Sequence, residues 1–109
     1  MTDCIVVLVT VASRDEGSRM AETLVSEQLA ACVNVIGPIS SIYRWDNQIQ
    51  RDEEWLLVIK TRAAQFDTLA ARVRALHSYE TPEVIALPIT AGSEAYLAWL
   101  RTASGPPGS

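Results

Sequence analysis

The side chains best suited to bind a metal ion lie in one short segment, RALHSYETPEVIALPI. His77 is the only histidine of the chain, and a neutral imidazole is a common ligand of copper and zinc. Glu80 follows three residues later and adds a carboxylate, with Glu83 close behind. One chain thus offers fewer than the four ligands of a structural zinc site. The segment predicts a weak or inter-subunit site for copper(II) or another divalent cation at His77 and Glu80, with no cofactor required. The alternative is that His77 ends a helix, where a cation is favourable, and that Glu80 pairs locally.

A second group of side chains is suited to bind a small organic ligand. Tyr43 and Trp45 precede a predicted turn, Tyr79 stands beside the histidine, and Lys60 is the only lysine. Aromatic side chains with one convergent ammonium group can form a pocket for a small anionic metabolite. The alternative is that these aromatic residues pack in an interface between subunits, where Tyr and Trp are enriched.

The two cysteines, Cys4 and Cys32, stand in no metal-binding spacing. They exclude a disulfide framework and favour a cytosolic setting. Cys32 offers a redox-sensitive or metal-binding thiol near a cleft, or else a small buried apolar side chain. Cys4 begins the first predicted strand and is interpreted as structural.

Charge and composition exclude several classes of protein. The net charge is −4 and the pI about 4.8, so the chain lacks the basic surface of a nucleic-acid-binding or membrane-surface protein. No apolar run approaches the ~20 residues that span a bilayer. The first ten residues, MTDCIVVLVT, predict a strand rather than a signal peptide, and we expect a cytoplasmic protein. Motifs for phosphate binding, serine hydrolysis and zinc proteolysis are missing from the sequence, which predicts a protein that is not an enzyme.

Strands and helices alternate along the chain. Residues 4–11, almost all β-branched or aliphatic, predict a central strand buried on both faces. Ser13 and Glu16 form a capping signal at the start of the first helix. The order β-α-β-β-α-β predicts an α+β, ferredoxin-like domain over residues 1–103 with a short C-terminal helix, followed by a disordered tail at 104–109. The other expected elements are a helix over 14–30, strands over 32–44 and 49–61, a helix over 64–77 and a strand over 84–89.

The second and third strands are expected to form a long hairpin with an apolar base and a polar arm. Gly37-Pro38 predicts a bulge and an edge position for the second strand, and Asp46-Asn47 predicts the turn. The charged run 51–54 is interpreted as a solvated strand face. In this topology both long helices cover one face of the sheet, yet the strands carry apolar side chains on both faces. The open face therefore predicts a homo-oligomer that associates sheet to sheet.

Several strings resemble one family in order and spacing. They are LAACVNVI, SIYRW, LLVIKTR, RALHSYETPEVIALPI and YLAWL, and together they cover roughly residues 4–101. All resemble the divalent-cation tolerance (CutA) family. The resemblance implies a ferredoxin-like homotrimer with the shape of the PII signalling proteins, and an association with tolerance to copper and other divalent ions. It also implies that Cys32, Tyr43, Trp45, Lys60 and Tyr79 gather around clefts between subunits.

The chain departs from the family pattern at two positions. Members usually carry Pro after the loop histidine, where this chain has Ser78, and some have a Cys in the first strand, where this chain has Val9. The second departure removes a thiol ligand for copper. Two functional hypotheses follow: a cytosolic homotrimer that responds to, and binds, divalent metal ions, or a PII-like signalling trimer that binds a small metabolite in its clefts with no direct metal role.

Overall fold

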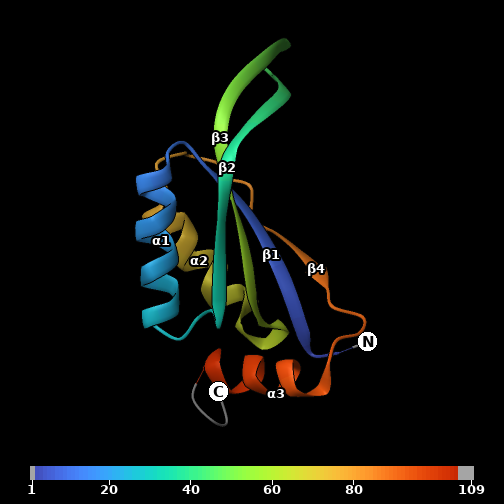
Figure 1. The fold of residues 1–109 in the computed structure, drawn as a ribbon. Coiled ribbons are helices and arrows are strands. Elements are labelled where there is room, and N and C mark those ends of the chain that lie inside the picture. Colours follow the sequence, from blue (N-terminus) through green and yellow to red (C-terminus); the bar gives the residue numbers. More distant parts are fainter. Residues whose placement is uncertain (1, 106–109) are drawn as a thin grey trace.

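A computed structural model describes residues 2–105 and has the predicted order of elements. Strands and helices alternate as β-α-β-β-α-β and a third helix follows (Figure 1). The ferredoxin-like α+β fold is thereby confirmed. The elements are β1 (Cys4–Val11), α1 (Arg14–Ser26), β2 (Cys32–Trp45), β3 (Gln48–Arg62), a 3-10 turn (Ala63–Gln65), α2 (Phe66–Leu76), β4 (Ile85–Pro88) and α3 (Glu94–Ala103).

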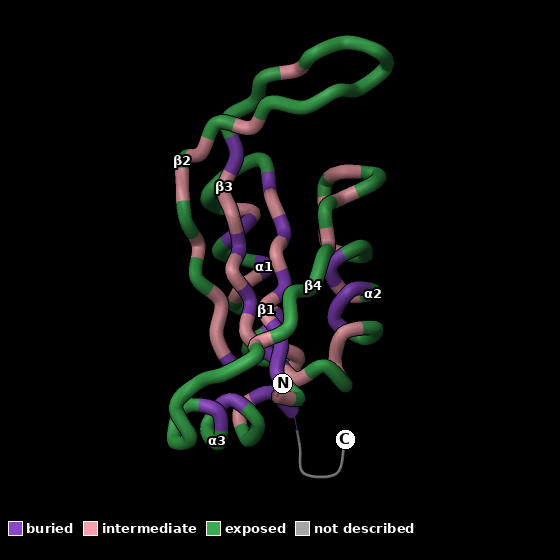
Figure 2. Tube along the Cα trace, turned by 90° about the vertical axis from the view of Figure 1, so that its right-hand side faces the viewer, coloured by how far each residue is buried: buried purple, intermediate pink, exposed green. Residues whose placement is uncertain are grey.

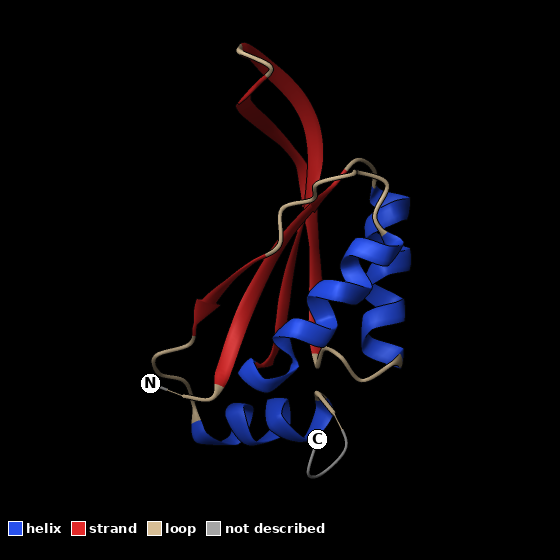
Figure 3. Cartoon of the chain, turned by 180° about the vertical axis from the view of Figure 1, so that it is seen from behind, coloured by secondary structure: helices blue, strands red, loops and turns tan. Residues whose placement is uncertain are grey.

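The four strands form one sheet in the order β2-β3-β1-β4, with every neighbouring pair antiparallel. β2 and β4 are the two edge strands, so the predicted edge position of β2 is confirmed. Helices α1 and α2 both cover one face of the sheet (Figure 3). The core lies between that face and the two helices, because alternate residues of each strand point to the same side. Its fully buried members include Val7, Val9, Val11, Leu24, Leu57, Ile59, Leu69 and Val73.

The first helix begins where the sequence predicts and ends earlier. The Ser13 hydroxyl accepts a hydrogen bond from the Glu16 backbone N–H at 3.1 Å, as expected of an N-cap. The predicted end at residue 30 is wrong, because Gln28 adopts a left-handed conformation with φ 61° and the N–H groups of Leu29 and Ala30 both turn back to the Leu24 carbonyl. The second helix likewise covers 66–76 rather than 64–77, and a 3-10 turn precedes it.

The β2–β3 hairpin is long, and its outer half projects beyond the body of the domain (Figure 1). Asp46 and Asn47 form its turn with φ values of 52° and 60°, the left-handed pair that suits the twist of two strands joined by a two-residue loop. The predicted irregularity lies at Gly37-Pro38, where the register shifts. A Cβ at Gly37 would lie 2.4 Å from the indole of Trp55, so the strand approaches Trp55 there only because residue 37 is glycine.

The sheet face opposite α1 and α2 is apolar and exposed, as the strand sequences predict. Ile36, Ile85 and Leu87 are each about half exposed, at 47%, 51% and 49%. β4 holds the last two opposite Leu8 and Val6 of β1, so these four side chains share one face. Figure 2 shows the buried residues concentrated in the body, with the arm of the hairpin and β4 exposed. A face of this composition is typical of surfaces through which proteins associate.

The third helix closes one end of the sheet. Its N-cap, Ser93, accepts a hydrogen bond from the Tyr96 N–H, and Leu97 and Leu100 pack against Cys4 and Ala31. The predicted start of the tail at residue 104 is too early. Ser104 is fully buried, and its carbonyl oxygen accepts hydrogen bonds from Arg62 and Gln65. Of the tail expected over 104–109, residues 106–109 lie outside the described residues.

Candidate functional site

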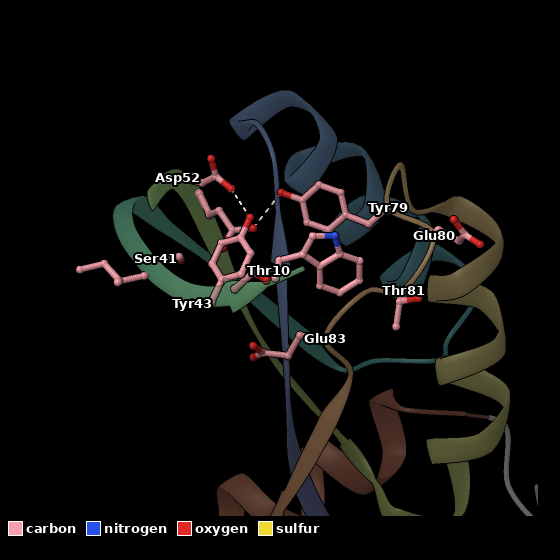
Figure 4. Close-up of a pocket in the computed structure, with 11 residues that line it drawn as sticks. Thr10, Ser41, Tyr43, Asp52, Tyr79, Glu80, Thr81 and Glu83 are labelled. Carbon is pink, nitrogen blue, oxygen red and sulfur yellow. Dashed lines mark hydrogen bonds between the residues drawn. The ribbon is translucent and has the colours of Figure 1, made fainter. Parts of the chain in front are cut away.

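An open pocket of about 620 Å³ lies where the arm of the hairpin leaves the body of the domain. The end of β1, both strands of the hairpin and the loop between α2 and β4 form its walls (Figure 4). This volume is typical of pockets that enclose a small molecule. The lining residues are Thr10, Ser41, Ile42, Tyr43, Trp45, Asp52, Glu54, Tyr79, Glu80, Thr81 and Glu83.

Two tyrosine–carboxylate pairs organise the pocket. The Tyr79 hydroxyl donates to Glu54 at 2.7 Å, and the Tyr43 hydroxyl donates to Asp52 (Figure 4). Burial raises the pKa of the Tyr79 hydroxyl, and so does its hydrogen bond to the Glu54 carboxylate. The hydrogen bond to Asp52 similarly raises the pKa of Tyr43. Both phenols therefore stay neutral, and each holds its ring in a fixed orientation.

The pocket is acidic. Four carboxylates line it, and none of its described lining residues is Lys, Arg or His. The carboxylates come from two sources, since Asp52 and Glu54 belong to β3 while Glu80 and Glu83 belong to the loop. The sequence interpretation of residues 51–54 as a solvated strand face is wrong for Glu54, which is 7% exposed. Such a lining favours a cationic ligand over an anionic one.

His77 is a structural residue of the loop behind the pocket. Its side chain is fully buried. Nε2 lies 2.7 Å from the Thr10 carbonyl oxygen, and Nδ1 accepts a hydrogen bond from the Tyr79 N–H at 2.9 Å. Nε2 therefore carries the proton, and the lone pair of Nδ1 is already used. His77 as a metal ligand stays a prediction, and the geometry of one chain argues against it: a metal ion would have to displace one of these two hydrogen bonds to reach a ring nitrogen.

A second contact fastens the same loop to α1. The Glu16 carboxylate accepts the Ser78 N–H and the Ser78 hydroxyl, both at 2.9 Å. Burial raises the pKa of Glu16, but these two hydrogen bonds and the nearby His77 ring outweigh it, and the pKa of Glu16 lies below its usual value. We call this contact the Glu16–Ser78 clasp. It explains what Ser78 does: a proline there would have no N–H to donate.

Replacing Glu16 with glutamine is expected to lower the free energy of unfolding by about 1–2 kcal/mol at neutral pH, since hydrogen bonds to a charged group are lost. The folded state holds the pKa of Glu16 below the ordinary 4.5. The contribution is therefore present above that value and is lost as the pH falls through the folded-state pKa. Urea denaturation from about pH 7 to about pH 3 measures this. Asp15→Asn, an exposed change in the same helical turn, is the control. A difference between wild type and Glu16→Gln that does not shrink in acid contradicts the assignment.

The structure divides the residues that were expected to gather in one cleft. Tyr43, Trp45 and Tyr79 line the pocket, and Glu80 joins them. Cys32 and Lys60 instead lie opposite each other near the other end of the hairpin, where the Lys60 ammonium donates to the Asn34 side chain. Lys60 lies eight positions along β3 from Asp52, which is about 26 Å at the usual rise of a strand. Within one chain, the only lysine is thus not part of this pocket.

Comparisons with known proteins assign this chain to a family. Residues 5–103 match the family described as CutA1 divalent ion tolerance protein. The chain belongs to the CutA1 family. The divalent-cation tolerance protein CutA of Thermus thermophilus is 48% identical over 100 residues, which are 92% of this chain and 97% of the relative. The chloroplastic protein CutA of Arabidopsis thaliana is 50% identical over the same share of this chain, which spans only 55% of that relative's length.

Solved CutA1 structures have the same fold. The divalent cation tolerance protein of Thermus thermophilus superposes with a TM-score of 0.92 at 47% identity, covering 94% of this chain and 99% of that one. CutA1 from Oryza sativa superposes with a TM-score of 0.91 at 48% identity, covering 94% of each chain. The resemblance seen in the sequence is therefore confirmed.

In residues 2–105, none of the helices has the length and apolarity needed to cross a bilayer.

The CutA1 family name raises the question of whether these residues fit a divalent ion. Across residues 2–105, no three His, Cys, Asp or Glu side chains stand close enough to hold a metal together. His77 is sequestered, and the position of a first-strand thiol is occupied by buried Val9. Residues 2–105 of one chain therefore do not present imidazole and thiol ligands together. The side chains still available to bind a divalent ion are carboxylates. Glu80 and Glu83 line the pocket, are exposed and accept no hydrogen bond from the described residues.

Sequence reasoning missed the β1 and β3 side of the pocket. Thr10, Asp52 and Glu54 were not among the expected site residues. One signal was available for Glu54. It is the last residue of the charged run, and it shares the open face of β3 with Leu56 and Val58, because every second residue of a strand points to the same side. A carboxylate at the boundary between a polar arm and an apolar base is well placed to be buried.

Proposed function

We propose that this CutA1 protein acts in tolerance to divalent cations as a homotrimer that binds a small ligand in the pocket between the hairpin and the 77–83 loop. The observation that carries the proposal is the pocket itself, with fixed aromatic rings, four carboxylates and a volume of about 620 Å³. The proposal is related to the signalling alternative of the two sequence hypotheses, which placed the ligand in clefts between subunits, whereas this pocket is formed by one chain. Binding rather than catalysis is proposed, since the two tyrosine hydroxyls of the pocket are neutral and are held by carboxylates.

The proposal of a homotrimer rests on the open sheet face. Val6, Leu8, Ile85 and Leu87 share this face, and the part of the chain that the structure describes provides no layer over it. A second copy of the chain carries the same apolar face and the same projecting arm. Burying such a face yields about 25 cal/mol for each Å² of apolar area.

A cytoplasmic location is also proposed. Its support is that Cys4 and Cys32 are both free thiols, as is usual in a reducing compartment. The names of the Arabidopsis and Oryza relatives place those proteins in the chloroplast.

A second candidate function is direct binding of copper(II) or another divalent cation. The observation in its favour is that Glu80 and Glu83 both line the pocket and that their carboxylates have no hydrogen-bond partners among residues 2–105. Carboxylate oxygens are suited to hard divalent ions, and additional ligands would come from water or a neighbouring subunit. Such a site is weak and does not use His77.

Native mass spectrometry of the metal-free protein, followed by titration with copper(II), distinguishes the two functions. We expect a mass of three chains that takes up no fixed number of ions, which supports the ligand-binding function. A fixed number of ions that disappears in Glu80→Gln/Glu83→Gln assigns the pocket to the metal instead. Glu22→Gln/Glu94→Gln, which removes the same charge from exposed positions on α1 and α3, is the matched control. A mass other than three chains contradicts the homotrimer.

A further inference from the structure

The walls of the pocket are more aromatic than the binding of an inorganic ion requires. Tyr43, Trp45 and Tyr79 all line it, from β2 and from the 77–83 loop. Figure 4 shows the tyrosine hydroxyl groups turned toward their carboxylate partners. With each hydroxyl fixed by a carboxylate, the faces of the rings are left to contact a ligand. Aromatic faces carry a negative quadrupole that attracts cations.

One carboxylate of the pocket is almost completely buried yet incompletely paired. Glu54 is 7% exposed, and Tyr79 donates to its Oε2 atom. No described residue donates to its other oxygen. This second oxygen is not a buried unpaired atom, since among the described residues that condition is met by the Trp55 indole nitrogen and not by Glu54. It is therefore open to a positive charge that enters from the pocket, and the described lining contains no Lys, Arg or His to supply one.

The two features together discriminate between kinds of ligand. A divalent metal ion requires about six oxygen ligands and gains nothing from aromatic walls. A small anion is repelled by Asp52, Glu54, Glu80 and Glu83. An organic ammonium ion is attracted both by the ring faces and by the carboxylates, and its carbon skeleton fills a pocket of this size.

We propose that the pocket binds an organic cation that carries an alkylated ammonium group, with Tyr43, Trp45 and Tyr79 against the ammonium and Glu54 as its buried counter-ion. The inference rests on the proposed function, because it names the ligand class of the same pocket. It replaces the small anionic metabolite expected from the sequence. That expectation depended on Lys60, which lies at the other end of the hairpin.

Isothermal titration calorimetry with three probes on the intact wild-type protein tests the charge requirement. The probes are choline, its uncharged isostere 3,3-dimethyl-1-butanol, and succinate. We expect choline to bind at least about tenfold more tightly than the isostere, as a cation among aromatic rings should, and succinate not to bind. Equal binding of choline and the isostere overturns the inference but leaves a small-ligand pocket. Binding of succinate alone overturns the inference and supports a pocket for a small anion, which leaves the proposed ligand-binding function standing. Binding of none of the three overturns the inference.

Matched variants test the aromatic wall. Trp45→Ala is expected to weaken choline binding by about tenfold, and Trp45→Phe to restore most of it. Trp45 and Trp99 are both about half exposed, at 58% and 47%, and Trp99 lies on α3 outside the pocket, so Trp99→Ala is the control. The mass of each variant assembly is measured in parallel. Unchanged binding in Trp45→Ala, or an equal loss in Trp99→Ala, contradicts the assignment of the pocket.

Discussion

Replacing Leu87 with aspartate is expected to leave each chain folded and to dissociate the assembly into monomers. Leu87 is half exposed on the open face of β4, so the change removes little from the core of a single chain. In a homotrimer that buries this face, however, three new carboxylates lose their water without gaining partners. Each such burial costs several kcal/mol, more than an interface can lose without dissociating. The expected result is a native mass of one chain with an unchanged circular dichroism spectrum.

The same substitution on the opposite face of the sheet has a different outcome. Leu57 is fully buried against α1 and α2, and Leu57→Asp places a charge in the core of each chain, which is expected to abolish folding. Ala71→Asp, an exposed change on α2, should alter neither the fold nor the mass. A three-chain mass for Leu87→Asp would show that the open face is not the surface of association.

The second large effect is expected for His77→Ala, which should lower the free energy of unfolding by about 2–4 kcal/mol. The change deletes two buried hydrogen bonds and leaves the Thr10 carbonyl and the Tyr79 N–H without partners, each at a cost of about 1–3 kcal/mol. It also removes the ring that packs against Tyr79 with centroids 4.7 Å apart. Urea denaturation measures the loss.

A metal ligand and a structural residue behave differently at this position. Glutamine can still donate and accept, so His77→Gln should recover part of the stability. If His77 holds the loop rather than a metal, both variants change stability while the stoichiometry of copper(II) in the folded protein stays that of wild type. Loss of a fixed copper(II) stoichiometry in a His77→Gln protein of native stability would reinstate His77 as a ligand.

The parts of the fold that depend on local pattern could be predicted from the sequence. β1 is a continuous apolar run, Ser13 caps α1, Asp46-Asn47 makes the turn and Gly37-Pro38 marks the irregularity of β2. Each of these is a property of a few neighbouring residues. Helix ends were less predictable, because Gln28 terminates α1 through a backbone conformation that its residue type does not require.

The candidate site was only half predictable, because its key contacts join distant parts of the chain. The sequence pattern could single out His77 as a rare residue. It could not show that the Thr10 carbonyl, 67 positions away, accepts a hydrogen bond from its ring. Lys60 and Trp45 were grouped because their side chains could bind the same ligand. The register of the hairpin places them far apart, since Trp45 pairs with Gln48 at the turn and Lys60 pairs with Cys32 at the other end. Glu54 was grouped with its charged neighbours, and only the fold shows that Tyr79 buries it.

The Glu16–Ser78 clasp has a consequence for motion. Two successive N–H groups of the loop, those of Ser78 and Tyr79, bond to side chains of Glu16 and His77 rather than to a backbone ladder. The loop is held to the rest of the domain by side-chain contacts, which are the clasp, the His77 bond to the Thr10 carbonyl and the Tyr79 bond to Glu54. This wall of the pocket can therefore open by local unfolding without separating any strands. Amide hydrogen exchange at Ser78 and Tyr79 consequently reports the opening of the pocket wall. We expect it to be faster than the exchange of the amides within the sheet.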